Sequence, residues 1–209
     1  MLIFGVWLGW KVNKARQQRE AVEEIESVGG IVWYDYQALD DRRWDETIDP
    51  PWPAWLETIL GRDFLYDAVG VDLSGEPLFE ASEDSDGIRL RHAMRQASEL
   101  NQLRVLEVCV ASREGFAALE RFTNIRRLVV YISINPLYHG ELDRDIASLG
   151  KLRNLTELDL AAFGLGDGGL RQLESLSRLR FLGLDYTSVT SDGLQRLKEA
   201  LPTCEIYGW

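Results

Sequence analysis

The sequence predicts an α/β solenoid in which parallel strands form a concave sheet and helices cover its convex side, preceded by an N-terminal helix-strand cap. The main observation is a repeat: the run Leu155–Leu160 recurs as Leu179–Leu184, 24 residues later. Each run alternates apolar and polar residues as a strand does, and the residues that follow have helical apolar spacing. One strand-plus-helix unit cannot bury its apolar face alone, so neighbouring units are expected to stack.

Weaker copies extend this repeat in both directions over residues 67–209. About six strands are expected, at positions around Val71, Leu106, Leu128, Leu158, Leu182 and Cys204. The last copy is placed by a shift of 22 residues, which aligns Leu201 with Leu179. The unit after Val130 is six residues longer than 24, and its extra residues form an insertion within 131–147.

Residues 1–10 are all apolar or glycine and are followed at once by a basic cluster. Ten helical residues span about 15 Å, half of the roughly 30 Å of a bilayer core. Three interpretations stay open: the end of a longer membrane anchor, a short interfacial anchor, or an apolar N-terminus packed on the protein. The first predicts a membrane-associated protein with a soluble repeat domain, tethered through residues 1–10, and the last fits a cytoplasmic protein.

Residues 11–66 are expected to cap the open apolar edge that a stack of repeats leaves. A helix is predicted over 11–26 with Ala15, Val22 and Ile25 on one face, and a strand over 31–36. An acidic loop over 37–53 and a short helix from Pro53 follow. A separate ligand-binding module is the alternative interpretation of this region.

Two sequence motifs of the repeat resemble those of a known family. The L-x-x-L-x-L pattern of 155–160 and 179–184, with the unit ending Val189-Thr-Ser-Asp-Gly-Leu194, resembles the leucine-rich-repeat family. It is most similar to small bacterial members with an N-terminal membrane anchor. The position that carries Asn, Cys or Thr in the family is Thr187 in one unit but Phe163 in the other. The resemblance implies recognition of a protein partner and no catalysis.

The charge distribution narrows the class of partner. The formal net charge is −11, and residues 31–87 contain fifteen acidic and three basic side chains. This argues against nucleic-acid binding, which needs Lys and Arg to replace the counterions of the phosphates.

No residue pattern predicts a catalytic, metal or cofactor site. Residues 164–169 match G-x-G-x-x-G, but the repeat makes them an ordinary strand-to-helix loop, in which Asp167 could cap the following helix. Cys109 and Cys204 are expected nearly 19 Å apart, too far for a disulfide, with Cys109 pointing outwards. His92 and His139 have no neighbouring ligand at metal-binding spacing.

The outward strand positions form three rows, and the middle row is Asp72, Glu107, Val129, Asp159, Gly183 and Glu205. Like charges on neighbouring strands cost about 0.2–1 kcal/mol per pair, so a purely structural sheet has no reason to prefer them. The hypothesis is an acidic groove with aromatic contacts that binds a basic peptide or protein, through Asp72, Glu107, Tyr131, Glu157, Asp159, Phe181, Asp185, Glu205 and Tyr207. A solvated polar face is one alternative. A structural envelope-associated protein that contacts partners through residues 31–66 is another, and the oligomeric state stays open.

Overall fold

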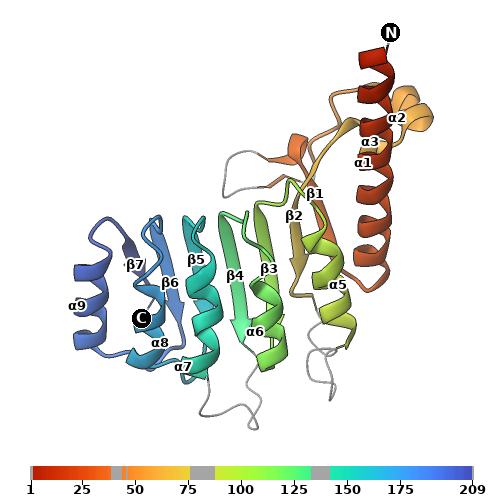
Figure 1. Ribbon diagram of the computed structural model, residues 1–209. Coiled ribbons are helices and arrows are strands. Elements are labelled where there is room, and N and C mark those ends of the chain that lie inside the picture. The colour runs from red at the N-terminus through yellow and green to blue at the C-terminus, as the bar shows by residue number, and fades with distance from the viewer. Residues whose placement is uncertain (1, 39–43, 46, 76–87, 133–141, 209) are drawn as a thin grey trace.

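The chain has an α/β fold built on a sheet of seven strands. The computed structural model describes residues 2–38, 44–45, 47–75, 88–132 and 142–208. The strands follow the chain order: β1 (Ile31–Tyr34), β2 (Ala68–Leu73), β3 (Val105–Val110), β4 (Arg127–Ile132), β5 (Glu157–Ala161), β6 (Phe181–Asp185) and β7 (Glu205–Tyr207). Strand β1 pairs antiparallel with β2, and every later neighbour pairs in parallel (Figure 1).

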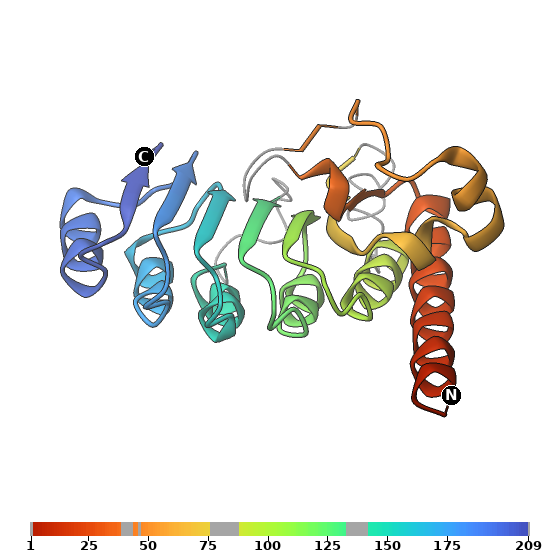
Figure 2. The same cartoon turned by 90° about the horizontal axis from the view of Figure 1, so that it is seen from above.

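Helices cover one face of the parallel part of the sheet. Figure 2 shows them side by side in one layer, and they are α5 (Ile88–Ser98), α6 (Arg113–Leu119), α7 (Leu142–Asp145), α8 (Asp167–Leu173) and α9 (Ser191–Ala200). The 3-10 helix η3 (Ile146–Lys151) follows α7. Right-handed connections return each helix to the same face, and no helix among the described residues lies on the opposite face of the parallel strands.

The predicted strand register is confirmed for five of the six parallel strands. Leu106 is opposite Leu128, Leu128 opposite Leu158, and Leu158 opposite Leu182. All four side chains are fully buried under the helices. Alternation places these leucines on the helix side and the residues between them on the other side.

A turn precedes each strand from β3 to β7 and repeats along the chain with the strand. The backbone N–H of an apolar residue donates to the carbonyl three residues earlier, as in Ile125 to Phe122 and Leu179 to Leu176, at 3.3 and 2.9 Å. In the last unit Cys204 donates to Leu201 at 3.0 Å. Leu201 therefore corresponds to Leu176 and not to Leu179.

This correspondence corrects the register of the last strand. In the structure Ile206 is opposite Leu182, with Glu205 opposite Phe181 and Tyr207 opposite Gly183. The predicted shift of 22 residues was wrong by two. Helix α9 has ten residues where α8 has seven, so the leucine that ends the helical part comes later in the sequence.

One continuous helix, α1 (Leu2–Ser27), replaces the predicted division at residue 10. Its Ala15, Val22 and Ile25 are buried, as the apolar stripe predicted. The side chains of Phe4 and Trp10, in its first turns, are exposed, which contradicts an apolar N-terminus packed on the protein. Within the described residues, no helix has both the length and the hydropathy that crossing a bilayer requires.

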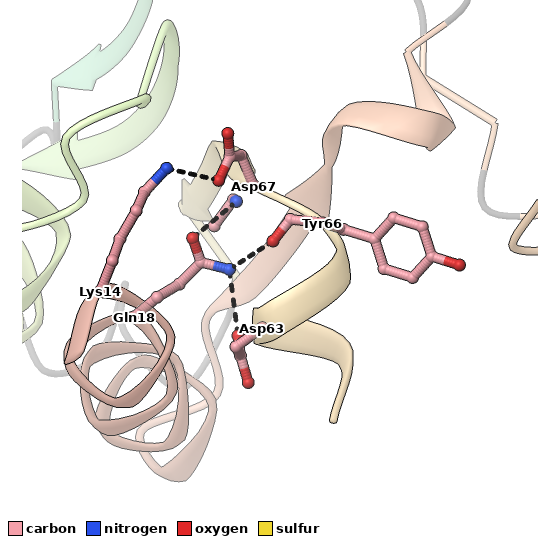
Figure 3. Close-up of polar contacts among 6 residues, drawn as sticks. Lys14, Gln18, Asp63, Tyr66 and Asp67 are labelled. Atoms are coloured by element: carbon pink, nitrogen blue, oxygen red, sulfur yellow. Dashed lines mark hydrogen bonds and ion pairs between the residues drawn. The ribbon is translucent and has the colours of Figure 1, made fainter. Parts of the chain in front are cut away.

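Buried polar contacts fasten α1 to the segment that leads into β2 (Figure 3). The Gln18 amide donates to the Asp63 carboxylate at 3.1 Å and to the Tyr66 carbonyl at 2.9 Å, and it accepts the N–H of Ala68 at 3.2 Å. Asp63 lies in the short helix α3 (Arg62–Leu65), which follows α2 (Ala54–Leu60). Lys14 adds an ion pair with Asp67 at 2.7 Å.

Candidate functional site

The face of the parallel sheet opposite helices α5–α9, called the open sheet face below, carries every residue of the predicted site. The strand pairings define its rows. The first row is Gly70, Val105, Arg127, Glu157, Phe181 and Glu205, and the middle row is Asp72, Glu107, Val129, Asp159, Gly183 and Tyr207. The third row contains Cys109, Tyr131, Ala161 and Asp185.

The corrected register of β7 changes the site. Tyr207 occupies the middle row, where Glu205 was expected, and Glu205 moves to the first row beside Phe181. From there the Tyr207 hydroxyl donates a hydrogen bond to the Asp159 carboxylate, across Gly183. A Cβ at Gly183 would lie 3.0 Å from the Tyr207 ring, so only glycine lets this contact form without displacing the ring.

The β2 end of the open sheet face is covered by tryptophans. The Trp33 side chain of β1 lies over Gly70, where a Cβ would come within 2.7 Å of the indole ring. Trp44 stacks on Trp33 with ring centroids 5.5 Å apart. Val105 and Cys109 are also buried, although both hold outward positions. Cys109 thus holds the outward position that the repeat predicts, and its side chain is nevertheless buried there.

Glu107 is a partly buried carboxylate on this face, with other carboxylates near it. Burial raises the pKa of Glu107, and the negative charges of Asp72 and Asp159 raise it further, while Arg127 acts in the opposite direction. Asp72 is directly opposite Glu107 on the neighbouring strand. Burial and the same carboxylates raise the pKa of the Tyr131 phenol as well.

Arg127 is a part of the site that the sequence analysis did not assign. Its guanidinium lies 3.8 Å from the Glu157 carboxylate and 3.9 Å from that of Asp159. The sequence signal was present, since Arg127 is the cation of the first row, next to a middle row rich in carboxylates. Arg127 thus partly compensates the negative charge of Glu157 and Asp159 on β5, and it also acts on Glu107 of the neighbouring strand β3.

A shallow depression of about 190 Å³ lies at the centre of the open sheet face. Glu107, Arg127, Tyr131, Asp159 and Asp185 line it. The structure thus brings four of the predicted site residues around one hollow. The other predicted residues lie elsewhere on the open sheet face: Asp72, Glu157, Phe181, Glu205 and Tyr207. Of these, Asp72 accepts the Ser74 N–H at 2.7 Å.

The glycine-rich loop at 164–169 has a structural role, as the repeat predicted. The Asp143 carboxylate of the preceding unit accepts the Gly166 N–H at 3.0 Å. A Cβ at Gly169 would lie 2.9 Å from an Asp143 oxygen, so a side chain of the protein fills the space that a nucleotide phosphate would need.

The same contact recurs one repeat later and corrects the expected role of Asp167. This carboxylate accepts the backbone N–H of Thr190 at 2.8 Å and its hydroxyl at 2.7 Å, which lowers the pKa of Asp167. Asp167 therefore stabilises the start of the next helix and not of its own. Thr190 caps that helix, since its hydroxyl accepts the Gly193 N–H at 3.1 Å.

The described residues contain no group of three or more His, Cys, Asp and Glu side chains placed to hold a metal ion. Cys109 and Cys204 form no disulfide. The predicted insertion around His139 falls largely on residues 133–141, which lie outside the described part of the chain.

Comparison with known proteins gives likenesses of fold at low identity. No family model and no curated protein matches the chain. Among solved structures, the tropomodulin C-terminal domain of Caenorhabditis elegans is 16% identical with a TM-score of 0.46, covering 65% of this chain and 83% of that one. An internalin of Listeria monocytogenes is 18% identical with a TM-score of 0.35, covering 55% and 32%. A leucine-rich-repeat protein of Leptospira interrogans is 17% identical with a TM-score of 0.33, covering 54% and 33%. These TM-scores are all below 0.5, and the evidence for the repeated strand-helix unit is the register of the strands.

Proposed function

We propose that this protein is a non-catalytic interaction module that binds a basic peptide or protein segment on its open sheet face. The observation that carries the proposal is the charge of that face. Its rows present six carboxylates and a single guanidinium, those of Asp72, Glu107, Glu157, Asp159, Asp185, Glu205 and Arg127. A cationic side chain of a partner would relieve repulsion that the free protein retains.

The central depression suits one or two cationic side chains and no large ligand. Glu107 and Asp159 face it, and Tyr131 stands beside them with 42% of its surface exposed. Tyr207, at 48% exposure, extends the aromatic surface towards β7. A guanidinium held between the carboxylates could also stack on these rings, where a cation–π contact contributes about 0.5–1 kcal/mol.

The test uses a fluorescent nine-residue peptide of alternating Arg and Ala, and the same peptide with Gln in place of Arg. The double variant Glu107→Gln/Asp159→Asn is expected to bind the Arg peptide about tenfold more weakly, because two partly exposed ion pairs with the peptide are lost. The control Glu99→Gln/Glu174→Gln changes the net charge equally at exposed positions on the helix side. An equal loss in this control, or equal binding of the Gln peptide, would contradict the proposal.

We also propose that the repeated units form a leucine-rich-repeat solenoid whose first edge is capped by residues 11–66. In support, β1 pairs with β2 along that edge, and α1 packs on α5 with Glu24 3.2 Å from His92. Trp33 and Tyr34 of β1 are buried in the same region. Deleting residues 1–66 is therefore expected to abolish cooperative unfolding. Retention of a sharp unfolding transition by the 67–209 fragment would contradict the cap.

A second candidate function is attachment of the N-terminal region to a membrane or another envelope component. Its support is the exposure of Phe4, Trp7 and Trp10 on α1, together with that of Trp55 on α2. Tryptophan side chains favour the membrane–water interface. Co-sedimentation with vesicles of phosphatidylcholine and phosphatidylglycerol tests it. Binding should fall in Trp7→Ser/Trp10→Ser and persist in Glu107→Gln. Absence of vesicle binding by the unaltered protein would contradict a tether through residues 1–10.

A further inference from the structure

A groove on the helix side of the sheet has the opposite charge from the open sheet face. It lies between α5 and α6, has a volume of about 510 Å³, and is called the helix groove below. Its basic residues are Arg91 and Arg95 of α5, one helical turn apart, and Arg121, just beyond α6. Among the described residues, its lining also contains one acidic residue, Glu114, and His92, which lies 3.2 Å from the Glu24 carboxylate.

Among the described residues, no carboxylate forms an ion pair with Arg91, Arg95 or Arg121. Elsewhere on this side of the sheet arginines do pair within the protein, as Arg113 does with Asp145 at 3.1 Å and Arg196 with Asp167 at 3.1 Å. A chain with a net charge of −11 thus leaves three cations together around one groove.

Apolar and small side chains form the rest of the helix groove. Ile88, at the start of α5, is 60% exposed, and Ala117 and Ala118 of α6 provide the small residues on the opposite wall. Small side chains on α6 let a partner approach its backbone closely. An apolar floor between cationic walls is complementary to a segment that presents carboxylates and apolar side chains together.

We propose that the helix groove binds an acidic amphipathic segment of a partner protein. The apolar floor favours such a peptide over a phosphate backbone, which has no apolar side to bury. The helix groove and the open sheet face lie on opposite sides of the sheet, so the protein has separate surfaces for an acidic and a basic segment.

The experiment measures binding of a fluorescent 14-residue peptide of Glu and Leu, with Leu at helical spacing, to the full chain. The variant Arg91→Gln/Arg95→Gln should bind at least about fivefold more weakly, because two ion pairs at a partly exposed site are lost. Ala117→Glu should also weaken binding, by repulsion and by filling the groove. The control Arg171→Gln/Lys198→Gln removes two exposed cations from α8 and α9 and should change the affinity less than twofold.

Several outcomes would overturn the proposal. One is an equal loss of affinity in the control, which would mean that net charge and not the helix groove attracts the peptide. Another is equal binding of a peptide with Gln in place of every Glu. Inorganic polyphosphate that binds more tightly than the peptide, with the same dependence on Arg91 and Arg95, would assign the groove to phosphate polyanions. Circular dichroism of each variant shows whether its fold is retained.

Discussion

Substituting Glu107 by Gln is expected to stabilise the fold while weakening the proposed binding of basic segments. The carboxylate is partly buried on β3, directly opposite Asp72 on β2. Burial raises its pKa, with a further increase from Asp72 and Asp159 and a decrease from Arg127. The native state therefore binds the Glu107 proton more tightly than the unfolded chain does. Ionisation of Glu107 accordingly costs free energy of folding.

The sign and size of the effect follow from these contacts. Above the ordinary carboxyl pKa of 4.5, the unfolded chain releases this proton first, so stability falls as the pH rises through the folded-state pKa. Gln removes one like-charge pair between neighbouring strands, which is worth about 0.2–1 kcal/mol. For a domain of this size the melting temperature should rise by about 0.4–4 °C at pH 7.

Urea unfolding followed by tryptophan fluorescence measures this difference at several pH values. The gain from Glu107→Gln should be largest at pH 7 and shrink steadily towards pH 4, where the native carboxyl is protonated. Glu99→Gln, at an exposed position after α5, should change stability by less than about 0.5 kcal/mol throughout. A loss of stability at pH 7, or a gain that does not depend on pH, would refute the reasoning.

Three further substitutions test contacts that the structure assigns. Asp143→Ala leaves the Gly166 N–H without its carboxylate and should cost about 1 kcal/mol in urea unfolding, whereas Asp143→Asn should retain most of the contact. Gly70→Ala places a Cβ 2.7 Å from the Trp33 ring, so a loss of about 1–3 kcal/mol is expected, together with a changed tryptophan spectrum. Gln18→Ala leaves buried backbone groups unpaired and should cost about 2–3 kcal/mol, measured as a lower melting temperature.

The sequence predicted the parallel strands because their leucines carry the information that fixes the register. A slip of one residue would turn Leu158 or Leu182 to the wrong face, so the pattern allows one pairing. The outward positions follow from the same alternation, which is why most of the proposed site residues could be named in advance.

The parts that the sequence analysis missed depend on the lengths of helices and on contacts between units. Leu201 is buried like the inward leucines of the strands, but because α9 is longer, it corresponds to Leu176 of the preceding unit. Aligning Leu201 with Leu179 therefore placed β7 in the wrong register. The carboxylates of Asp143 and Asp167 reach into the following unit, and no spacing within one unit indicates this. Cys109 is buried through tertiary packing that the strand pattern alone does not encode.

The division of roles between the two faces of each strand explains how the sheet can tolerate an acidic row. Inward leucines such as Leu158 and Leu160 supply the burial that holds β5 in place, at about 1.5–3 kcal/mol for each side chain. Repulsion among outward carboxylates costs less than this for each pair. The outward residues beside them, Glu157 and Asp159, can therefore differ from unit to unit without loss of register. A binding surface on this fold can therefore change its chemistry while the core stays constant. Glu107 illustrates this, because a purely structural sheet would not place a partly buried carboxylate directly opposite Asp72.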